Sequence, residues 1–236
     1  MIKGKKILAI IPARGGSKGI PRKNILEVNG KPLIAWTIEQ AKKSRYIDRL
    51  ILSSEDQEII TIAKKWECEV PFVRPQILAT DEAIGVNVIL HAMATINNHY
   101  DYIVVLQPTS PLRSHADIDT CIDICHSQKA PACVSVTEAE KNPFWMYFLD
   151  KNNVMRPILD IADRPTRRQD LPAAFALNGA VYVAEWDWFL KSKQFVSSQT
   201  VAYIMPQERS LDIDTHIDFN FFQYIAGLSQ PKNING

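Results

Sequence analysis

Short apolar runs alternate with amphipathic stretches along the chain, and this alternation limits the folds open to it more than any other feature. The run at 6–11 (KILAII) is almost continuously apolar over the length of one strand, as expected for a strand covered on both faces. Similar runs lie at 49–53 (RLILS) and 102–106 (YIVVL). The stretches between them have apolar residues at helical spacing, so the order predicts an α/β fold with a mostly parallel sheet and helices on both faces.

The same order continues almost to the C-terminus. Further strands are expected at 69–73, 132–136, 179–184 and 200–205, and helices at 32–43, 54–66, 82–96, 116–127 and 215–225. Ser54 is expected to cap its helix, with Gln57 as its capping-box partner. The alternation fails over 141–172, which predicts an excursion from the sheet, either a small lobe or a dimerisation arm. We therefore expect residues 1–236 to form one domain with this insertion.

The composition excludes several classes of protein. Of 236 residues, 46% are hydrophobic, which allows a sizeable core, and 27 Lys and Arg against 26 Asp and Glu give a net charge of +1. This balance argues against a polyelectrolyte that binds nucleic acid. The sequence has no apolar run of about 18 residues, no signal-peptide pattern and no CxxC pair among its four cysteines. These features predict a cytoplasmic protein with reduced thiols and no membrane partner.

The most informative segment is the loop at 13–24 (ARGGSKGIPRKN), directly after the first strand. It has three glycines, no acidic residue and four cations, namely Arg14, Lys18, Arg22 and Lys23. Glycines let backbone N–H groups approach an anion and the cations neutralise it, so a polyphosphate is the expected guest. The loop has neither GxxxxGK[ST] nor GxGxxG spacing. The alternative is a solvated basic loop or a nucleic-acid contact.

Two further segments place polar groups where a ligand would bind. Gln107 follows the run at 102–106, where an amide would contact a base or a sugar; the alternative is a strand-terminal turn. Asp212 and Asp214 flank Ile213, so in an extended segment both carboxylates point to one face. Such a pair suits Mg²⁺, which is usually held by one or two carboxylates plus phosphate oxygens. The alternative is helix capping by Asp214 or Thr215 with Asp212 exposed.

Arginines provide additional candidate anion contacts. Arg164, Arg167 and Arg168 cluster in one segment, and Arg74 follows the strand expected at 69–73. Guanidinium groups bind carboxylates and phosphates bidentately, but a solvated loop or a subunit contact explains the cluster equally well. The sequence contains no Gly-x-Ser-x-Gly elbow, and its histidines lack metal-ligand spacing.

Taken in order, these segments resemble one family. IPARGGSKGIPRKN, RPQILATD, LQPTSPLR, RRQDLP, NGAVY and SLDIDT occur in the order and spacing of the acylneuraminate cytidylyltransferases, or CMP-sialic acid synthetases, whose bacterial relatives include enzymes for legionaminic acid. The resemblance covers residues 6–225. It implies a Rossmann-like nucleotidyltransferase fold, a dimerisation lobe at 141–172 and a homodimer. The implied reaction converts CTP and a nine-carbon 2-keto sugar acid into CMP-sugar and pyrophosphate, with Mg²⁺ as cofactor.

The resemblance also implies roles for individual residues. Arg14, Lys18 and Lys23 would be the catalytic cations that hold the CTP phosphates. The nucleotide would also be bound by Ala13, Gly15, Asn24, Arg74, Ala79 and Asp81. The sugar acid would be contacted by Gln107, Arg168, Asn178 and Tyr182. Asp212 and Asp214 would hold Mg²⁺.

Departures from the family pattern bear on the base and on the sugar. Ile84 and Gly85 stand where some sialate-activating relatives have serines, which argues against side-chain contacts to the base from these positions. Trp145 stands where some sialate-activating relatives have lysine. Either the changed pocket fits a 5,7-diamino acid such as diacetyllegionaminate, or the change is neutral and the acceptor is N-acetylneuraminate. Gly19 argues against pseudaminate enzymes, which tend to have arginine there. The alternatives are a cytidylyltransferase for 3-deoxy-manno-octulosonate and a non-catalytic module that binds nucleotides or nucleic acid.

Overall fold

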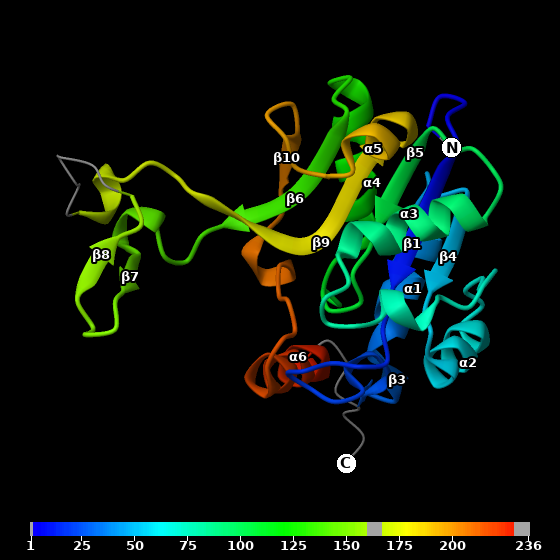
Figure 1. Cartoon of the computed structure of the whole chain (residues 1–236), viewed down its shortest axis with the longest axis horizontal. Helices are drawn as coiled ribbons and strands as arrows, with labels where there is room; N and C mark the ends of the chain where they lie inside the picture. Colours follow the sequence, from blue (N-terminus) through cyan, green and yellow to red (C-terminus); the bar gives the residue numbers. More distant parts are fainter. Residues whose placement is uncertain (1, 160–166, 229–236) are drawn as a thin grey trace, which may run out of the picture.

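The centre of the fold is a six-stranded sheet with the order β10-β6-β9-β5-β1-β4, seen in a computed structural model that describes residues 2–159 and 167–228 (Figure 1). β9 runs antiparallel to β5 and β6, whereas the other pairs are parallel. The predicted α/β fold with a mostly parallel sheet is confirmed. The strands are β1 (Ile7–Pro12), β4 (Arg49–Ser53), β5 (Tyr102–Val105), β6 (Ala132–Glu138), β9 (Phe175–Glu185) and β10 (Val201–Ile204).

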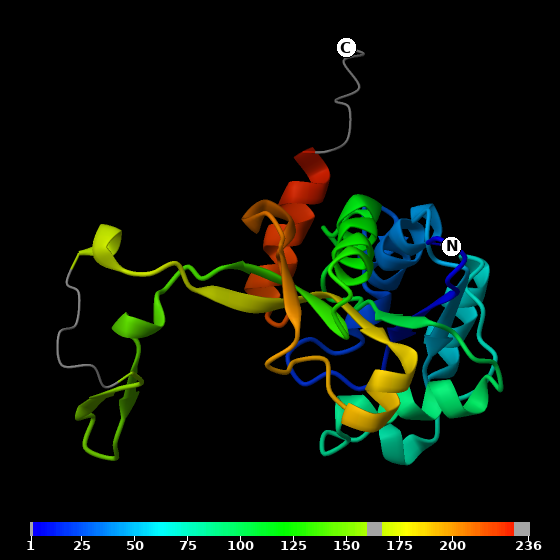
Figure 2. The same ribbon diagram turned by 90° about the horizontal axis from the view of Figure 1, so that it is seen from above.

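Helices cover both faces of this sheet (Figure 2). Ile7, Ala9 and Ile11 of β1 point to one helical layer, and Leu8 and Ile10 point to the other, which explains why the whole run is apolar. None of the described helices is long and apolar enough to cross a bilayer. The first layer contains α1 (Leu33–Lys43), α2 (Gln57–Lys65) and α4 (His115–Ser127), and the second contains α3 (Gly85–Thr95) and α5 (Trp186–Ser192).

A third apolar cluster joins the last helix to the basic loop. Phe219 and Phe222 of α6 (His216–Leu228) pack with Ile20 of the loop and with Ile213. The small hairpin of β2 (Glu27–Val28) and β3 (Lys31–Pro32) belongs to the same cluster through Val28. The basic loop is therefore fixed against a segment from the other end of the chain.

An arm leaves the sheet after β6 and returns along β9, projecting away from the body (Figure 1). Its described residues, 139–159 and 167–174, include a hairpin of β7 (Tyr147–Leu149) and β8 (Met155–Pro157). Phe148 is 64% exposed and Leu149 62% exposed, so the hairpin presents an apolar surface. The excursion expected at 141–172 falls within this arm, and its role in dimerisation stays a prediction.

Two expectations about local structure are wrong. No strand forms at 69–73: Glu69 makes one isolated bridge with Ile51, and Pro71 lacks the N–H group that a strand ladder needs. The N-cap of α2 is Asp56 instead of Ser54, because the Asp56 carboxylate accepts hydrogen bonds from the backbone N–H groups of Glu58 and Ile59.

Candidate functional site

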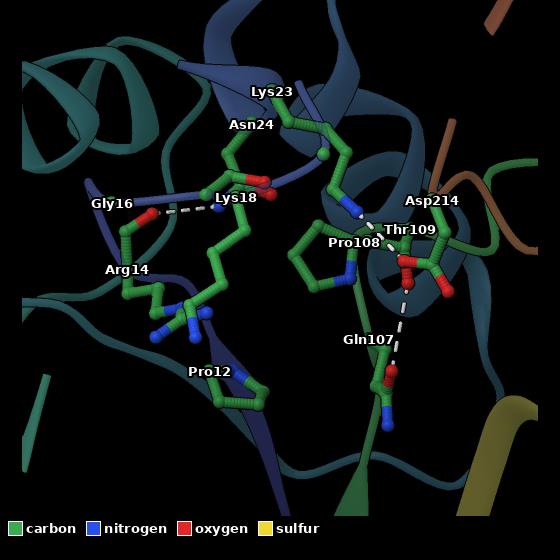
Figure 3. Close-up of a pocket in the computed structure, with 12 residues that line it drawn as sticks. Pro12, Arg14, Gly16, Lys18, Lys23, Asn24, Gln107, Pro108, Thr109 and Asp214 are labelled. Carbon is green, nitrogen blue, oxygen red and sulfur yellow. Dashed lines mark hydrogen bonds and ion pairs between the residues drawn. The ribbon is translucent and has the colours of Figure 1, made fainter. Parts of the chain in front are cut away.

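The carboxyl ends of β1 and β5 meet at a cavity of about 280 Å³ (Figure 3). Its lining comes from three separate segments: Pro12 at the end of β1 with the basic loop at 13–24, the turn at 107–109 after β5, and Asp214 before α6. This position is where open α/β sheets bind ligands. The structure therefore brings together the loop, Gln107 and one of the two predicted metal ligands.

Arg14 and Lys18 lie side by side at this cavity (Figure 3). Both reach the same carboxylate: Arg14 Nη1 lies 2.8 Å from Asp81 Oδ1, and Lys18 Nζ lies 3.1 Å from Asp81 Oδ2. The hydrogen bond from Lys18, and to a lesser extent that from Arg14, lowers the pKa of Asp81, so the Asp81 carboxylate is an anion at neutral pH. Two of the predicted phosphate-binding cations thus have an internal counter-ion.

Lys23 and Asn24 hold the end of the loop in place. The Lys23 ammonium, whose side chain is 10% exposed, donates to the backbone oxygen of Ile213 and lies 3.1 Å from Asp214 Oδ1. Asn24 Nδ2 donates to the backbone oxygen of Arg14 at 3.0 Å. The fourth cation of the loop, Arg22, pairs with Asp56 and Glu58 of the α2 segment instead of lining the cavity.

A buried ion pair beneath the loop was missed by the sequence analysis. Glu55 accepts a hydrogen bond from the backbone N–H of Gly15 at 2.7 Å and another from Arg74 Nη2 at 2.5 Å. The side chains of Arg74 and Glu55 are 3% and 8% exposed, and Arg74 also donates to the backbone oxygen of Ala13. Only Ser54 separates Glu55 from the end of β4, so its place beyond a strand end is a sequence signal that points to it.

A second cavity of about 350 Å³ adjoins the first, and Arg14 and Gln107 line both. Its other walls include Arg74, Asp81 and the apolar side chains of the segment before α3. Ala79 ends the 3₁₀ turn at Gln76–Leu78 in the same segment. Of the residues predicted to bind the nucleotide, Arg14, Lys23, Asn24, Arg74 and Asp81 line one or both of these cavities, whereas Ala13, Gly15 and Ala79 line neither.

The residues predicted to contact the sugar acid are dispersed. Gln107 Oε1 and Asp212 Oδ2 each lie 3.4 Å from where a Cβ of Gly179 would be, and this glycine has a positive φ of 71°. Asn178 is 4% exposed, and its amide bonds to Ser135 and Ser210, which makes it a support of the fold. The side chain of Arg168 and all of Arg164 lie outside the described residues.

Tyr182 stands apart from the first cavity. Its ring packs against Phe195 with centroids 5.4 Å apart, in the layer of α3 and α5. Burial, with a further contribution from the charge of Asp212, raises the pKa of Tyr182. Contacts of Gln107, Asn178, Tyr182 and Arg168 with a sugar acid stay predictions.

Arg113 is a second buried residue that the sequence analysis missed. It is 1% exposed, and its guanidinium donates to the backbone oxygens of Gln107 at 3.2 Å and Ala180 at 2.8 Å and to Thr37 Oγ1 at 2.7 Å. Burial lowers the pKa of Arg113 to about 9. These bonds tie the turn after β5, which contains Gln107, to β9.

Asp212 and Asp214, the predicted metal ligands, differ in environment and line different hollows. Burial raises the pKa of Asp212, and its Oδ1 is a buried oxygen without a hydrogen-bond donor among the described residues. The Asp214 side chain is 75% exposed. Within 2–159 and 167–228, no cluster of three or more His, Cys, Asp or Glu could enclose a metal. A cation there would complete its shell with water or phosphate oxygens, as Mg²⁺ usually does.

The fold and this site define a nucleotide-binding α/β domain with a basic, glycine-rich loop after its first strand. The family model described as Cytidylyltransferase matches residues 8–203. The chain therefore belongs to the cytidylyltransferase family. The structure is similar to a solved CMP:2-keto-3-deoxy-manno-octonic acid synthetase complexed with CTP, with a TM-score of 0.74 at 15% sequence identity. The similarity covers 95% of this chain and 100% of that one. At this identity the likeness shows the fold alone.

Curated relatives cover almost the whole chain. An N-acylneuraminate cytidylyltransferase of Escherichia coli O18:K1:H7 is 34% identical over 97% of this chain, which spans about half (53%) of that protein. A pseudaminic acid cytidylyltransferase of Campylobacter jejuni is also 34% identical, over 96% of this chain and 99% of its own length. A CMP-N,N'-diacetyllegionaminic acid synthase of Legionella pneumophila is 32% identical over 95% of this chain and 98% of its own length.

Proposed function

We propose that this chain transfers CMP from CTP to the anomeric hydroxyl of a nonulosonic acid and releases pyrophosphate. One observation carries the proposal: Arg14, Lys18 and Lys23 line the same cavity as Gln107 and Asp214. Relatives named for three different acids support this substrate class. Their identities of 32–34% are so similar that they favour no single acid, and N-acetylneuraminate and diacetyllegionaminate stay our candidate acceptors.

The residues of the cavity supply binding and charge neutralisation. Arg14, Lys18 and Lys23 would hold the triphosphate and stabilise the charge on the departing pyrophosphate. The anomeric oxygen would attack the α-phosphorus in line, so that a new P–O bond forms as the bond to pyrophosphate breaks. Gln107, fixed from below by Arg113, would orient the sugar acid for this attack.

Asp212 and Asp214 would hold Mg²⁺ beside the phosphates. When bound, this ion would neutralise phosphate oxygens and lower the pKa of the attacking hydroxyl. The unpaired buried oxygen of Asp212 supports this role, because an unsatisfied acceptor gains a partner when a cation binds. We further propose that two copies pair through the arm and that the protein acts in the cytoplasm.

The test is pyrophosphate release with CTP, Mg²⁺ and four acids: N-acetylneuraminate, diacetyllegionaminate, pseudaminate and 3-deoxy-manno-octulosonate. We expect turnover with a nine-carbon acid, and a loss of about 100-fold or more in kcat for Asp212→Asn and Asp214→Asn. Glu208→Gln is the matched control, because this carboxylate is 73% exposed and lies in the same segment.

Each other outcome points to a different conclusion. Turnover only with the eight-carbon acid would replace the acceptor class. Wild-type turnover by both aspartate variants at saturating Mg²⁺ would remove the metal role. Folded protein that does not bind CTP would favour the non-catalytic binding module.

A further inference from the structure

Both carboxylate oxygens of Asp81 contact cations of the basic loop. Oδ1 accepts from Arg14 Nη1 at 2.8 Å, and Oδ2 lies 3.1 Å from Lys18 Nζ. Arg14 also donates to the neighbouring backbone oxygen of Thr80 at 3.4 Å. The segment that contains Asp81 is thus held to the two cations that the proposed reaction assigns to phosphate.

The pair of Arg14 and Asp81 lies at the boundary between the two cavities. Arg14 lines both hollows, whereas Asp81 lines only the second. The side chains of Arg14, Lys18 and Asp81 are 37%, 76% and 46% exposed, so water and salt screen their attraction. An ion pair of this kind is weak enough for a polyphosphate to replace it.

We propose that Asp81 is an internal competitor for the phosphate site, which sets the affinity of this site for anions. The inference rests on the proposed use of CTP. An anion that reaches Arg14 and Lys18 must first displace the Asp81 carboxylate. This requirement lowers the affinity for every anion, so that a triphosphate still binds while singly charged or small anions do not occupy the site. The same carboxylate returns to the cations as pyrophosphate leaves.

This role differs from a contact with the nucleoside, and the difference is measurable. A carboxylate that contacts cytidine would affect CTP but not an anion without a base. A carboxylate that competes for Arg14 and Lys18 affects any polyphosphate. Inorganic tripolyphosphate, which has no base or ribose, is therefore the probe.

The experiment is calorimetric binding of inorganic tripolyphosphate to the full chain at low ionic strength, with a chelator present to remove divalent cations. We expect Asp81→Asn to bind it about three- to tenfold more tightly than the wild type, the range that two exposed ion pairs allow. The gain shrinks as salt is added. Glu82→Gln is the matched control, because this exposed residue removes the same charge from the same loop; its affinity stays within about twofold of the wild type.

Three results would overturn the inference. Unchanged or weaker tripolyphosphate binding by Asp81→Asn would show that the carboxylate does not compete. An equal gain in Glu82→Gln would show that net charge alone is responsible. Weaker CTP binding with unchanged tripolyphosphate binding would assign Asp81 to the nucleoside. The probe needs no sugar acid, so failure of the substrate panel leaves this measurement interpretable.

Discussion

The basic loop and the arm both leave the same sheet as irregular segments, but they are stabilised in opposite ways. The loop is held by hydrogen bonds within the chain. Gly15 donates to Glu55, Arg14 donates to Asp81, and Lys23 donates to the backbone oxygen of Ile213. The arm instead exposes apolar side chains on its hairpin. The loop is thus shaped by its own chain, whereas stabilisation of the arm by a second copy stays our proposal.

The largest expected effect comes from breaking the buried pair under the loop. Glu55→Ala leaves the Arg74 guanidinium buried without its counter-ion and removes the acceptor of Gly15, which costs about 3–5 kcal/mol. Denaturant unfolding measures this loss. Glu58→Ala is the control, since that carboxylate is 62% exposed and costs less than about 1 kcal/mol. Equal losses would show that the loop does not depend on the buried pair.

The arm is tested by removing an aromatic side chain from its hairpin. Phe148→Ala weakens self-association about thirtyfold, because a buried aromatic anchor at an interface contributes about 2 kcal/mol or more. Sedimentation over a range of concentrations measures the change. Ile77→Ala, which removes a side chain of 76% exposure outside the arm, leaves the association unchanged. Wild-type protein that is monomeric at all concentrations would contradict pairing through the arm.

The next effect concerns the body of the fold and depends on pH. The Asp117 side chain is fully buried, and although burial acts to raise its pKa, hydrogen bonds from Arg209, Ser114 and Tyr203 lower it to about 2. Because the folded-state pKa lies below the unfolded value of 3.8, the carboxylate stabilises the fold above that pH. Asp117→Asn therefore costs about 2 kcal/mol at pH 7.

The free-energy cost of Asp117→Asn decreases as the pH falls from about 4 to about 2, because the wild-type carboxyl becomes protonated over this range. Unfolding free energies of both proteins at pH 7 and pH 3 measure the change. A cost that stays constant over this range would show that the charge of Asp117 does not stabilise the fold.

The smallest effect tests the fit of the loop against the C-terminal segment. A Cβ at Gly19 would overlap the backbone oxygen of Asp214, whereas a Cβ at Gly16 would meet nothing within 4 Å. Gly19→Ala displaces the loop and raises KM for CTP about tenfold, which corresponds to about 1.4 kcal/mol. Gly16→Ala is the matched control, with KM within about twofold of the wild type. Equal KM values for both variants would mean that the loop adapts.

Much of the fold follows from local sequence patterns. The run at 49–53 has the bounds of β4, and the helix expected at 32–43 differs from α1 by one residue, because continuous apolar runs and helical spacing report burial directly. The insertion of β9 between β5 and β6, in the opposite direction, was not predicted. Strand order depends on pairing between distant segments, which no local pattern encodes.

The residues of the candidate site were likewise only partly predictable from the sequence. The basic loop is recognisable in the sequence because its glycines and cations lie in one segment. Gln107 and Asp214 line its cavity, as expected. Arg113 was missed because the role of a single charged residue depends on burial against remote partners, and Glu55 was missed although it lies just beyond the end of β4. Asn178 is predicted to contact the sugar acid; its amide bonds to Ser135 and Ser210, and its contact with a sugar stays a prediction.

The bond from Lys23 to the backbone of Ile213 joins residues 190 positions apart and bears on how the chain matures during synthesis. A ribosome produces Lys23 of the basic loop 190 residues before Ile213. Until that late segment emerges, the Lys23 ammonium and the apolar side chain of Ile20 have no covering partner from it. The cavity that we propose for phosphate is therefore complete only after the segment at 213–214 has been translated.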